Sequence, residues 1–307
     1  MSEVDGRHLS RPLRDVLRRR GRGSETAQTV EWEARKTFFN AAAGLTSYVG
    51  DDVDGLTFII STQDRGRGRL LFTKRALKEW RPLDRALAHL DARGLGDYAR
   101  ERVFVDVGAN IGSPCIPAVR RHGFRCALAL EPEPANFRLL RANVAINLLE
   151  DRIDSYPVAA SETGGVVPLA IHRGKSGRHS VRPPQPGEPS IQVEAVALDD
   201  FLPKVGLGPA DIGLLWIDVE GHETEVLLGA SALVRARVPI VVEVTRKSST
   251  LIALVPHYPE FADLREDSPI TPISGLEMSI EGLRGKETTD VLLIPPKSTA
   301  ERSQAAA

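Results

Sequence analysis

A short, mostly apolar run begins at position 103 and leads into a stretch, 106–112, in which polar residues and glycines alternate with apolar residues. The turn residues that could contact a ligand are Asp106, Gly108, Asn110 and Gly112. An apolar run that ends in glycines predicts a buried strand followed by a tight turn and a helix. A second apolar run, 126–130, ends at Glu131. Glycines in such a turn let the backbone approach a ligand, and the carboxylate can accept hydrogen bonds from both hydroxyls of a ribose.

The type of nucleoside follows from what this turn contains and lacks. A dinucleotide-binding turn needs the pattern G-x-G-x-x-G, whose second glycine admits a pyrophosphate at the helix N-terminus. Here Ala109 and Asn110 stand between the two glycines, and the carboxylate of Asp106 would repel a pyrophosphate. S-adenosylmethionine carries an ammonium and a sulfonium but no phosphate, so the turn favours it over NAD. The alternative is an ordinary α/β turn whose glycines serve geometry alone.

Four ionisable residues gather in a second stretch, 218–223, behind the apolar run 214–217. They are Asp218, Glu220, His222 and Glu223. Ligands of open α/β sheets bind outside the carboxyl ends of the strands, near the point where the strand order reverses. We therefore expect Asp218 to face the same crevice as Gly108 and Glu131. Carboxylates at the start of a helix also serve as caps and as partners of its dipole, an alternative that applies most to Glu223.

Apolar runs and helical patterns alternate from about residue 101 to 296, which predicts an α/β domain with a mostly parallel, doubly wound sheet and helices on both faces. Ser113 and Pro114 suit the cap and the first position of the helix after the glycine turn. A polar, hairpin-like excursion is predicted at 166–196, and its middle, rich in proline and glycine, is expected to hold little regular structure. The expected strands lie at 103–107, 126–130, 153–160, 214–218, 239–244 and 290–294.

Three further segments flank this domain. Residues 1–30 are rich in arginine and are expected to form a disordered tail, with a basic arm for RNA as the alternative. Residues 31–100 are expected to form an N-terminal extension of helices and a strand beside the substrate cleft, and residues 297–307 a second disordered tail. The loop 64–69, with three arginines and two glycines, either contacts the substrate or is a solvated turn.

Composition narrows the class of protein. The net charge of −1 over 307 residues argues against a protein built mainly to bind nucleic acid. The two cysteines, Cys115 and Cys126, form neither a disulfide framework nor a zinc pattern. No apolar run reaches the length of a membrane span and none resembles a secretory signal, so we expect a soluble cytoplasmic protein without a membrane partner.

Taken in this order, the motifs resemble those of the FkbM family of class I S-adenosylmethionine-dependent methyltransferases. The residues that carry the resemblance are 105–112, Glu131-Pro132-Glu133-Pro134, Asn136, Phe137, Leu140, Asn143 and 217–223. The resemblance covers roughly residues 100–245. It implies a Rossmann-like sheet of seven strands with a final antiparallel strand. It also implies methyl transfer from S-adenosyl-L-methionine, typically to a hydroxyl of a sugar or a specialised metabolite.

The resemblance also implies roles for single residues. The methionine end of the cofactor would be surrounded by Asp106, Gly108, Asn110 and Gly112. The ribose would be held by Glu131 with Asn136 near that corner, the adenine would lie near Ala159 and Ser161, and the sulfonium and the acceptor would face Asp218 and Glu220. Two departures from the family pattern stand out. Trp216 occupies a position where the family often has a lysine, and Lys175–Ser180 replaces an Asn-x-Gly-type segment.

Methyl transfer to a hydroxyl needs a base that takes the proton and a site that aligns the oxygen with the methyl group. The candidates for the base are Asp218, His222 and His179. His222 titrates near neutral pH, and His179 lies in the excursion, which could close over a substrate. The alternatives are two surface histidines and a divalent-cation site made of Asp218, Glu220 and Glu243. We predict no metal site.

Three hypotheses for the function stay open. The favoured one is O-methylation of a small hydroxylated molecule. The second is methylation of RNA or protein, which would give the basic residues a purpose, although the chain lacks an aromatic platform for bases. The third is a nucleoside-binding protein without catalysis, which would not need the acids Asp218 and Glu220. The sequence identifies neither the acceptor nor the oligomeric state.

Overall fold

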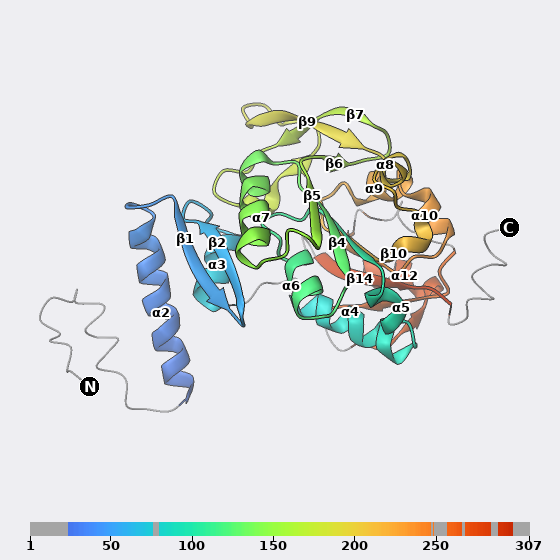
Figure 1. Cartoon of the computed structure of the whole chain (residues 1–307), viewed down its shortest axis with the longest axis horizontal. Coiled ribbons are helices and arrows are strands. Elements are labelled where there is room, and N and C mark those ends of the chain that lie inside the picture. Colours follow the sequence, from blue (N-terminus) through green and yellow to red (C-terminus); the bar gives the residue numbers. More distant parts are fainter. Residues whose placement is uncertain are drawn as a thin grey trace, which may run out of the picture. The chain divides into compact units, whose positions relative to one another are not determined.

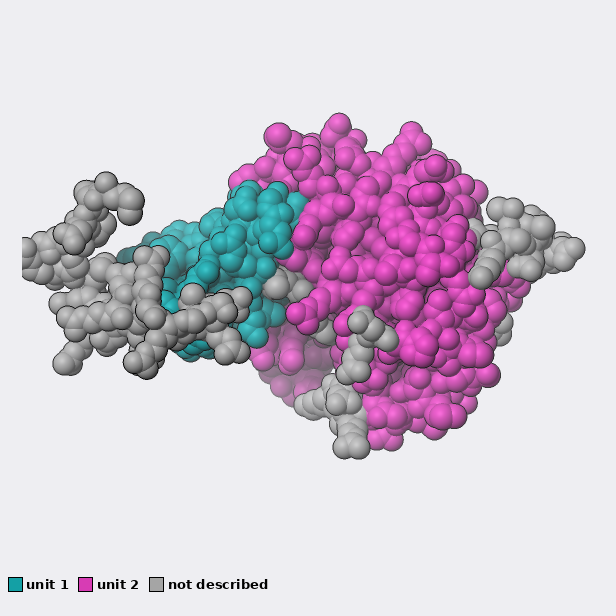
Figure 2. Space-filling view, turned by 90° about the horizontal axis from the view of Figure 1, so that it is seen from below, with its two compact units in different colours: residues 1–77 teal, residues 78–307 magenta. Residues whose placement is uncertain are grey.

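The structure is a computed structural model, and it describes residues 24–75, 80–246, 248, 257–265, 268–283 and 288–296. The chain divides into two compact units, Met1–Leu77 and Lys78–Ala307, which Figure 2 shows in different colours. The tail predicted at 1–30 lies outside the described residues up to position 23, as does the tail predicted at 297–307. Residues 24–30 belong to a helix, so their assignment to a disordered tail is wrong.

The described part of the smaller unit, residues 24–75, contains two helices and a two-stranded sheet (Figure 1). Its elements are α2 (Ser24–Ala42), the antiparallel pair β1 (Tyr48–Val53) and β2 (Leu56–Ser61), and α3 (Arg67–Lys74). Asp64 organises the arginine-rich loop, because its carboxylate accepts the backbone N–H groups of Gly66 at 2.8 Å and Gly68 at 2.7 Å. Arg67 and Arg69 therefore belong to the start of α3, and the predicted loop 64–69 is shorter than expected.

The larger unit is built on an eight-stranded sheet with the order β13–β12–β14–β11–β10–β3–β4–β5. The strands are β3 (Val103–Val107), β4 (Cys126–Leu130), β5 (Ile153–Tyr156), β10 (Ile212–Ile217), β11 (Ile240–Thr245), β12 (Glu260–Asp263), β13 (Thr271–Pro272) and β14 (Thr288–Ile294). The five strands from β5 to β11 pair in parallel, and β14 is antiparallel to both of its neighbours. The predicted mostly parallel sheet with a final antiparallel strand is confirmed. The two-residue edge strand β13 adds an eighth strand to the expected seven.

Helices cover both faces of this sheet, as predicted. They are α4 (Trp80–Ala92), α5 (Gly96–Arg100), α6 (Cys115–Arg120), α7 (Pro134–Ile146), α8 (Leu198–Lys204), α9 (Glu223–Leu228), α10 (Ser231–Arg235) and α12 (Leu276–Glu281). On one face the sheet residues Val105, Leu215 and Val242 pack in one core with residues of α8, α9, α10 and α12. Alternate residues of a strand point to opposite faces, so Phe104 lies on the other face, where it contacts Phe124 edge-on at 5.2 Å.

The strand order reverses at β3. The chain runs from β3 outward through β4 to β5 on one side, and then returns to add β10 and β11 on the other side. In parallel α/β sheets, ligands bind at such a switch point, outside the carboxyl ends of the strands. The carboxyl ends of β3, β4 and β10 are therefore where a ligand site is expected.

A second, four-stranded sheet with the order β6–β9–β7–β8 corrects two expectations. Its strands are β6 (Ala159–Ala160), β7 (Gly165–Ala170), β8 (Ser180–Val181) and β9 (Ser190–Val196). The predicted strand 153–160 is divided between the two sheets, because Pro157 lacks the N–H that a continuous ladder needs. The hairpin-like course predicted for the excursion is confirmed, because β7 and β9 pair in antiparallel fashion. It holds more regular structure than predicted, and its inward side chains Leu169, Val193 and Ala195 pack together.

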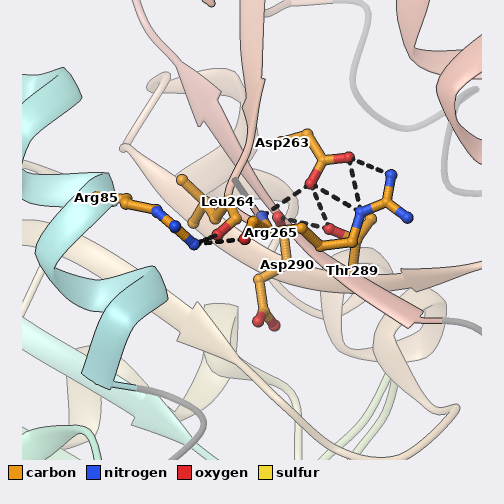
Figure 3. A network of polar contacts seen from close by, with 6 residues as sticks. All are labelled: Arg85, Asp263, Leu264, Arg265, Thr289 and Asp290. Atoms are coloured by element: carbon orange, nitrogen blue, oxygen red, sulfur yellow. Dashed lines mark hydrogen bonds and ion pairs between the residues drawn. The ribbon is translucent and has the colours of Figure 1, made fainter. Parts of the chain in front are cut away.

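The residues of α4 and α5 fall in the range 31–100 that was predicted to form the N-terminal extension, but they belong to the larger unit. Arg85 of α4 donates hydrogen bonds to the carbonyl oxygens of Leu264 at 2.9 Å and Arg265 at 2.5 Å (Figure 3). At the same place Asp263 accepts hydrogen bonds from the guanidinium of Arg265 and from the hydroxyl of Thr289. The hydrogen bonds of Arg85 connect α4 to the segment that follows β12, on the antiparallel side of the sheet. Among the described residues, none of the helices combines the length and apolar character needed to cross a membrane.

Close packing of α5 against β10 depends on Gly213. A Cβ atom at this position would lie 2.0 Å from the carbonyl oxygen of Ala99. We expect Gly213→Ala to destabilise the chain by about 2 kcal/mol and to lower the thermal midpoint by several degrees, because the backbone must move to relieve the overlap. The control is Gly208→Ala, where the nearest atom would lie at 3.7 Å. Equal thermal midpoints for both variants, measured by circular dichroism, would contradict this packing.

Candidate functional site

The turn after β3 and the turn after β10 meet backbone to backbone. A Cβ atom on Gly108 would lie 2.1 Å from the carbonyl oxygen of Asp218, so only glycine fits there. The N–H of Asp218 donates to the carbonyl of Val107 at 3.0 Å. Three turn residues have a positive φ, with values of 87° at Gly108, 52° at Asn110 and 93° at Gly112. The sequence motif around residue 108 and the acidic stretch that starts at Asp218 therefore lie side by side.

Asp106 is fully buried at the end of β3. Its Oδ2 accepts a hydrogen bond from the backbone N–H of Cys115, the first residue of α6, at 3.1 Å. The prediction that Ser113 caps this helix and that Pro114 is its first residue is wrong, because the helix begins one residue later. The hydroxyl of Ser113 is buried and has no hydrogen-bond partner among the described residues. Asp106 thus caps α6 from the strand.

Glu131, at the end of β4, is surrounded by hydrogen-bond donors. Its Oε2 accepts the backbone N–H of Asn110 at 2.8 Å, and its Oε1 accepts the backbone N–H of Glu133 at 2.9 Å and the side-chain amide of Asn136 at 3.4 Å. Burial raises the pKa of Glu131 to about 7, and the hydrogen bonds from the backbone oppose this rise. Each carboxylate oxygen has a second lone pair, so Oε2 keeps the capacity to accept from a ligand.

Asn136 is held in place by its helix. Glu133 caps α7, with its Oε2 accepting the backbone N–H of Asn136 at 2.7 Å, and Pro134 fills the first helical position. The side-chain amides of Asn136 and Asn110 both donate to the carbonyl oxygen of Ser176, at 3.1 Å and 3.0 Å. The other amide atom of Asn110, Oδ1, is buried and accepts no hydrogen bond from any described residue. It is an acceptor for a donor that a ligand would bring.

The acidic turn after β10 has a strained backbone and a buried carboxylate. Glu220 has φ 56° and Gly221 has φ 99°. Glu223 is buried, and its Oε1 accepts the N–H of Gly221 at 2.9 Å. Burial raises the pKa of Glu223 to about 7, and the negative charges of Glu243 and Asp218 add to the rise. The charges of Asp218, after β10, and Glu243, in β11, thus both act on Glu223. Among the described residues, no group of three or more His, Cys, Asp or Glu side chains could hold a metal ion.

His222 contacts Ser161 rather than the glycine turn. Its Nε2 lies 2.9 Å from the Ser161 hydroxyl, and its Nδ1 lies 3.5 Å from a carboxylate oxygen of Glu225. Burial lowers the pKa of His222 from its usual value, with the charge of Glu225 acting in the opposite direction. In the neutral form with Nδ1–H directed at Glu225, Nε2 accepts the hydroxyl proton of Ser161. The structure thereby joins one predicted catalytic residue to one predicted cofactor residue.

Two other predicted site residues have structural roles. The side chain of Ala159 packs in the core of the four-stranded sheet with Leu169 and Val193. The Nδ1 of His179 accepts the backbone N–H of His172 at 3.1 Å, so this nitrogen closes its own loop.

The sequence analysis missed Ser176 and Ser180. Ser176 contributes through its carbonyl oxygen, which every residue possesses, so its type gives no signal. Ser180 donates its hydroxyl proton to the carbonyl of Glu220 at 2.8 Å. A serine in an excursion of mixed polarity does not indicate such a partner 40 residues away.

Comparison with known proteins gives one family. The profile of the family described as methyltransferase FkbM domain matches residues 106–266. Over 155 residues the chain is 32% identical to the 31-O-demethyl-FK506 methyltransferase FkbM of Streptomyces tacrolimicus, covering 41% of this chain and 58% of that protein. Over 152 residues it is 28% identical to methyltransferase sdnD of Sordaria araneosa, covering 41% of this chain and 59% of that protein. The chain thus spans less than two thirds of the length of these curated relatives.

Solved structures are more distant. Methyltransferase FkbM from Methylobacillus flagellatus matches with a TM-score of 0.38 and 13% identity, covering 92% of this chain and 57% of that chain. TYW2 from P. horikoshii, in complex with MeSAdo, matches with a TM-score of 0.41 and 14% identity, covering 80% and 70%. At these scores the fold of this chain rests on its own strand order.

The raised pKa of Glu223 predicts a pH dependence of stability. Between its ordinary pKa of 4.5 and the folded value of about 7, the folded chain holds a proton that the unfolded chain releases, so stability falls as the pH rises through this range. Glu223→Gln cannot titrate. We expect the variant to be more stable than the wild type by about 2 kcal/mol at pH 8, with the difference vanishing near pH 4.5.

Urea unfolding at pH 8, 6 and 5 measures this difference, and the exposed Glu194→Gln on β9 is the matched control. A difference of the same size at all three pH values would contradict the assignment to Glu223.

Proposed function

We propose that this chain, which belongs to the FkbM methyltransferase family, transfers a methyl group from S-adenosyl-L-methionine to a hydroxyl of a small molecule, such as a sugar or a specialised metabolite. The family match covers residues 106–266, which include both the glycine turn and the acidic turn. The name of one relative, 31-O-demethyl-FK506 methyltransferase, describes a small molecule that lacks a methyl group on an oxygen. It supports an oxygen of a small molecule as the acceptor atom.

The observation that carries the proposal is the set of buried hydrogen-bonding groups around Glu131. The Oε2 of Glu131, which keeps acceptor capacity, suits a ribose hydroxyl, and the unpartnered Oδ1 of Asn110 suits a second hydroxyl or an ammonium group. The residues that would hold the cofactor on this side are Asp106, Gly108, Asn110, Gly112, Glu131 and Asn136. The carboxylate of Asp106 favours the positive end of S-adenosylmethionine and disfavours the pyrophosphate of NAD.

The cofactor supplies an activated methyl group, so the protein mainly aligns the acceptor oxygen and removes its proton. We assign the proton transfer to Asp218, whose backbone carbonyl lies directly against Gly108. The two histidine candidates are less suited, because His222 contacts Ser161 and His179 uses Nδ1 within its loop. Glu220, in the same turn, would face the acceptor. The proton leaves the hydroxyl as the new carbon–oxygen bond forms and the sulfur–carbon bond breaks.

Binding of the cofactor is the first test. We expect isothermal calorimetry to show saturable, one-site binding of S-adenosylmethionine to the full chain and no binding of NAD. We expect this difference because S-adenosylmethionine has no phosphate group, whereas the pyrophosphate of NAD would be repelled by the carboxylate of Asp106. Binding of NAD alone, or of neither ligand, would overturn the proposed function.

Two variants separate binding from turnover. Glu131→Gln loses the charge that accepts the ribose hydroxyls, so we expect the dissociation constant for S-adenosylmethionine to rise about tenfold or more. Asp218→Asn keeps the shape of the site but loses the base. We expect it to leave that dissociation constant within about twofold and to lower turnover about 100-fold.

Turnover is measured as release of S-adenosylhomocysteine with whichever hydroxylated acceptor in a panel of sugars and metabolites supports it. The exposed Glu150→Gln and Asp154→Asn are the matched controls. Unchanged cofactor affinity in Glu131→Gln would place the ribose elsewhere, and full turnover in Asp218→Asn would remove the base assigned here.

A further inference from the structure

The excursion between β7 and β9 reaches the site with one short segment. We call residues Lys175–Ser180 the clasp; they include a turn of 3₁₀-helix, Ser176–Arg178, and the first residue of β8. The clasp belongs to a loop whose base is joined by the hydrogen bond from the N–H of His172 to Nδ1 of His179, at 3.1 Å. Residues 172–175 are exposed, so the side of the loop that leads to the clasp faces solvent.

One end of the clasp covers the proposed cofactor side. The carbonyl oxygen of Ser176 accepts hydrogen bonds from the side chains of Asn110 and Asn136, which follow β3 and begin α7. The residues beneath are enclosed, with exposed fractions of 3% for Asn110, 4% for Asn136 and 5% for Glu131. A ligand that is to reach the Glu131 carboxylate must therefore displace protein.

The other end of the clasp contacts the acidic turn on the proposed acceptor side. The hydroxyl of Ser180 donates to the carbonyl oxygen of Glu220 at 2.8 Å, and Ser180 is itself buried. Two of the residues that the clasp contacts have an unusual backbone, because Asn110 with φ 52° and Glu220 with φ 56° are non-glycine residues in the left-handed region. Such conformations cost free energy and persist only where surrounding contacts hold them.

The clasp also fixes which atom of Asn110 meets a ligand. Its Nδ2 is bound to Ser176, so Oδ1 is the atom left to accept. If the amide turned over, the carbonyl oxygens of Asn110 and Ser176 would face each other, which is unfavourable. The contact with Ser176 therefore presents a hydrogen-bond acceptor, rather than a donor, to whatever binds beside Glu131.

We propose that the clasp is both the gate and the positioning element of the cofactor site. It opens by releasing Asn110, Asn136 and Glu220. When it closes, it orients the Asn110 side chain and the Glu220 backbone together. The inference rests on the proposed function, because the ligand it admits is S-adenosylmethionine. The clasp thereby couples binding of the cofactor to the geometry of the proposed acceptor side. The contacts that must break for it to open include its hydrogen bonds with Asn110, Asn136 and Glu220.

The test uses the full chain, Ser180→Ala and, as matched control, Ser190→Ala, in which the same change is made at an exposed position of the same excursion. Hydrogen exchange with mass spectrometry follows the backbone amides of residues 172–181. Stopped-flow measurements follow the binding of S-adenosylmethionine. Ser180→Ala removes one hydrogen bond, which corresponds to about a fivefold change in the opening equilibrium.

We expect saturating S-adenosylmethionine to slow exchange of residues 172–181 in the wild type. Ser180→Ala should exchange this segment about fivefold faster without ligand and should bind and release the cofactor faster, whereas Ser190→Ala should match the wild type. Cofactor binding with unchanged exchange in this segment, or equal rates in the two serine variants, overturns the clasp and leaves the proposed function standing. No binding of S-adenosylmethionine to the wild type overturns both.

Discussion

The close approach of the turns after β3 and β10 is the constraint on which the site depends. Gly108 leaves no room for a side chain against the carbonyl of Asp218, and the N–H of Asp218 binds the carbonyl of Val107. Contacts between backbones tolerate less variation than contacts between side chains, so the distance between the glycine turn and the acidic turn is set by the fold itself. The residues proposed to bind the cofactor follow one of these turns, and the residues proposed to face the acceptor follow the other. Their mutual position therefore follows from the pairing of two parallel strands.

A second consequence of this arrangement is the burial of Glu131. The N–H groups of Gly108 and Ala109 both donate to the carbonyl of Leu130 at 3.0 Å, which seats the glycine turn on the end of β4 and covers the next residue, Glu131. Removing a carboxylate from water is costly, and its raised pKa shows that the surrounding donors do not offset the whole cost. A ligand that brings further hydrogen-bond donors would offset more of it. The hydrogen-bond donors around Glu131 are thus in place without a ligand.

Local patterns in the sequence predicted much of this structure. The strand at 126–130 is confirmed to the residue and the strand that begins at 103 is confirmed in place, because apolar runs closed by glycine or by charge are short-range signals. Contacts between distant segments escaped prediction for physical reasons. The cap of α6 comes from Asp106, nine residues before Cys115, and Ser176 acts through a backbone atom. Pro157, which divides the predicted strand 153–160, was a signal that could have been used.

The distribution of charge on the acceptor side bears on what the chain can methylate. Glu223 is buried near Asp218 and Glu243, and their mutual repulsion contributes to its raised pKa. A phosphorylated small molecule or an RNA backbone would bring further negative charge to this place and would be repelled. A neutral hydroxyl brings none, and its proton meets a carboxylate that can accept it. The positive charge of the cofactor's sulfonium group would offset part of the repulsion among these acids, so cofactor binding and a neutral acceptor are favoured by the same electrostatics.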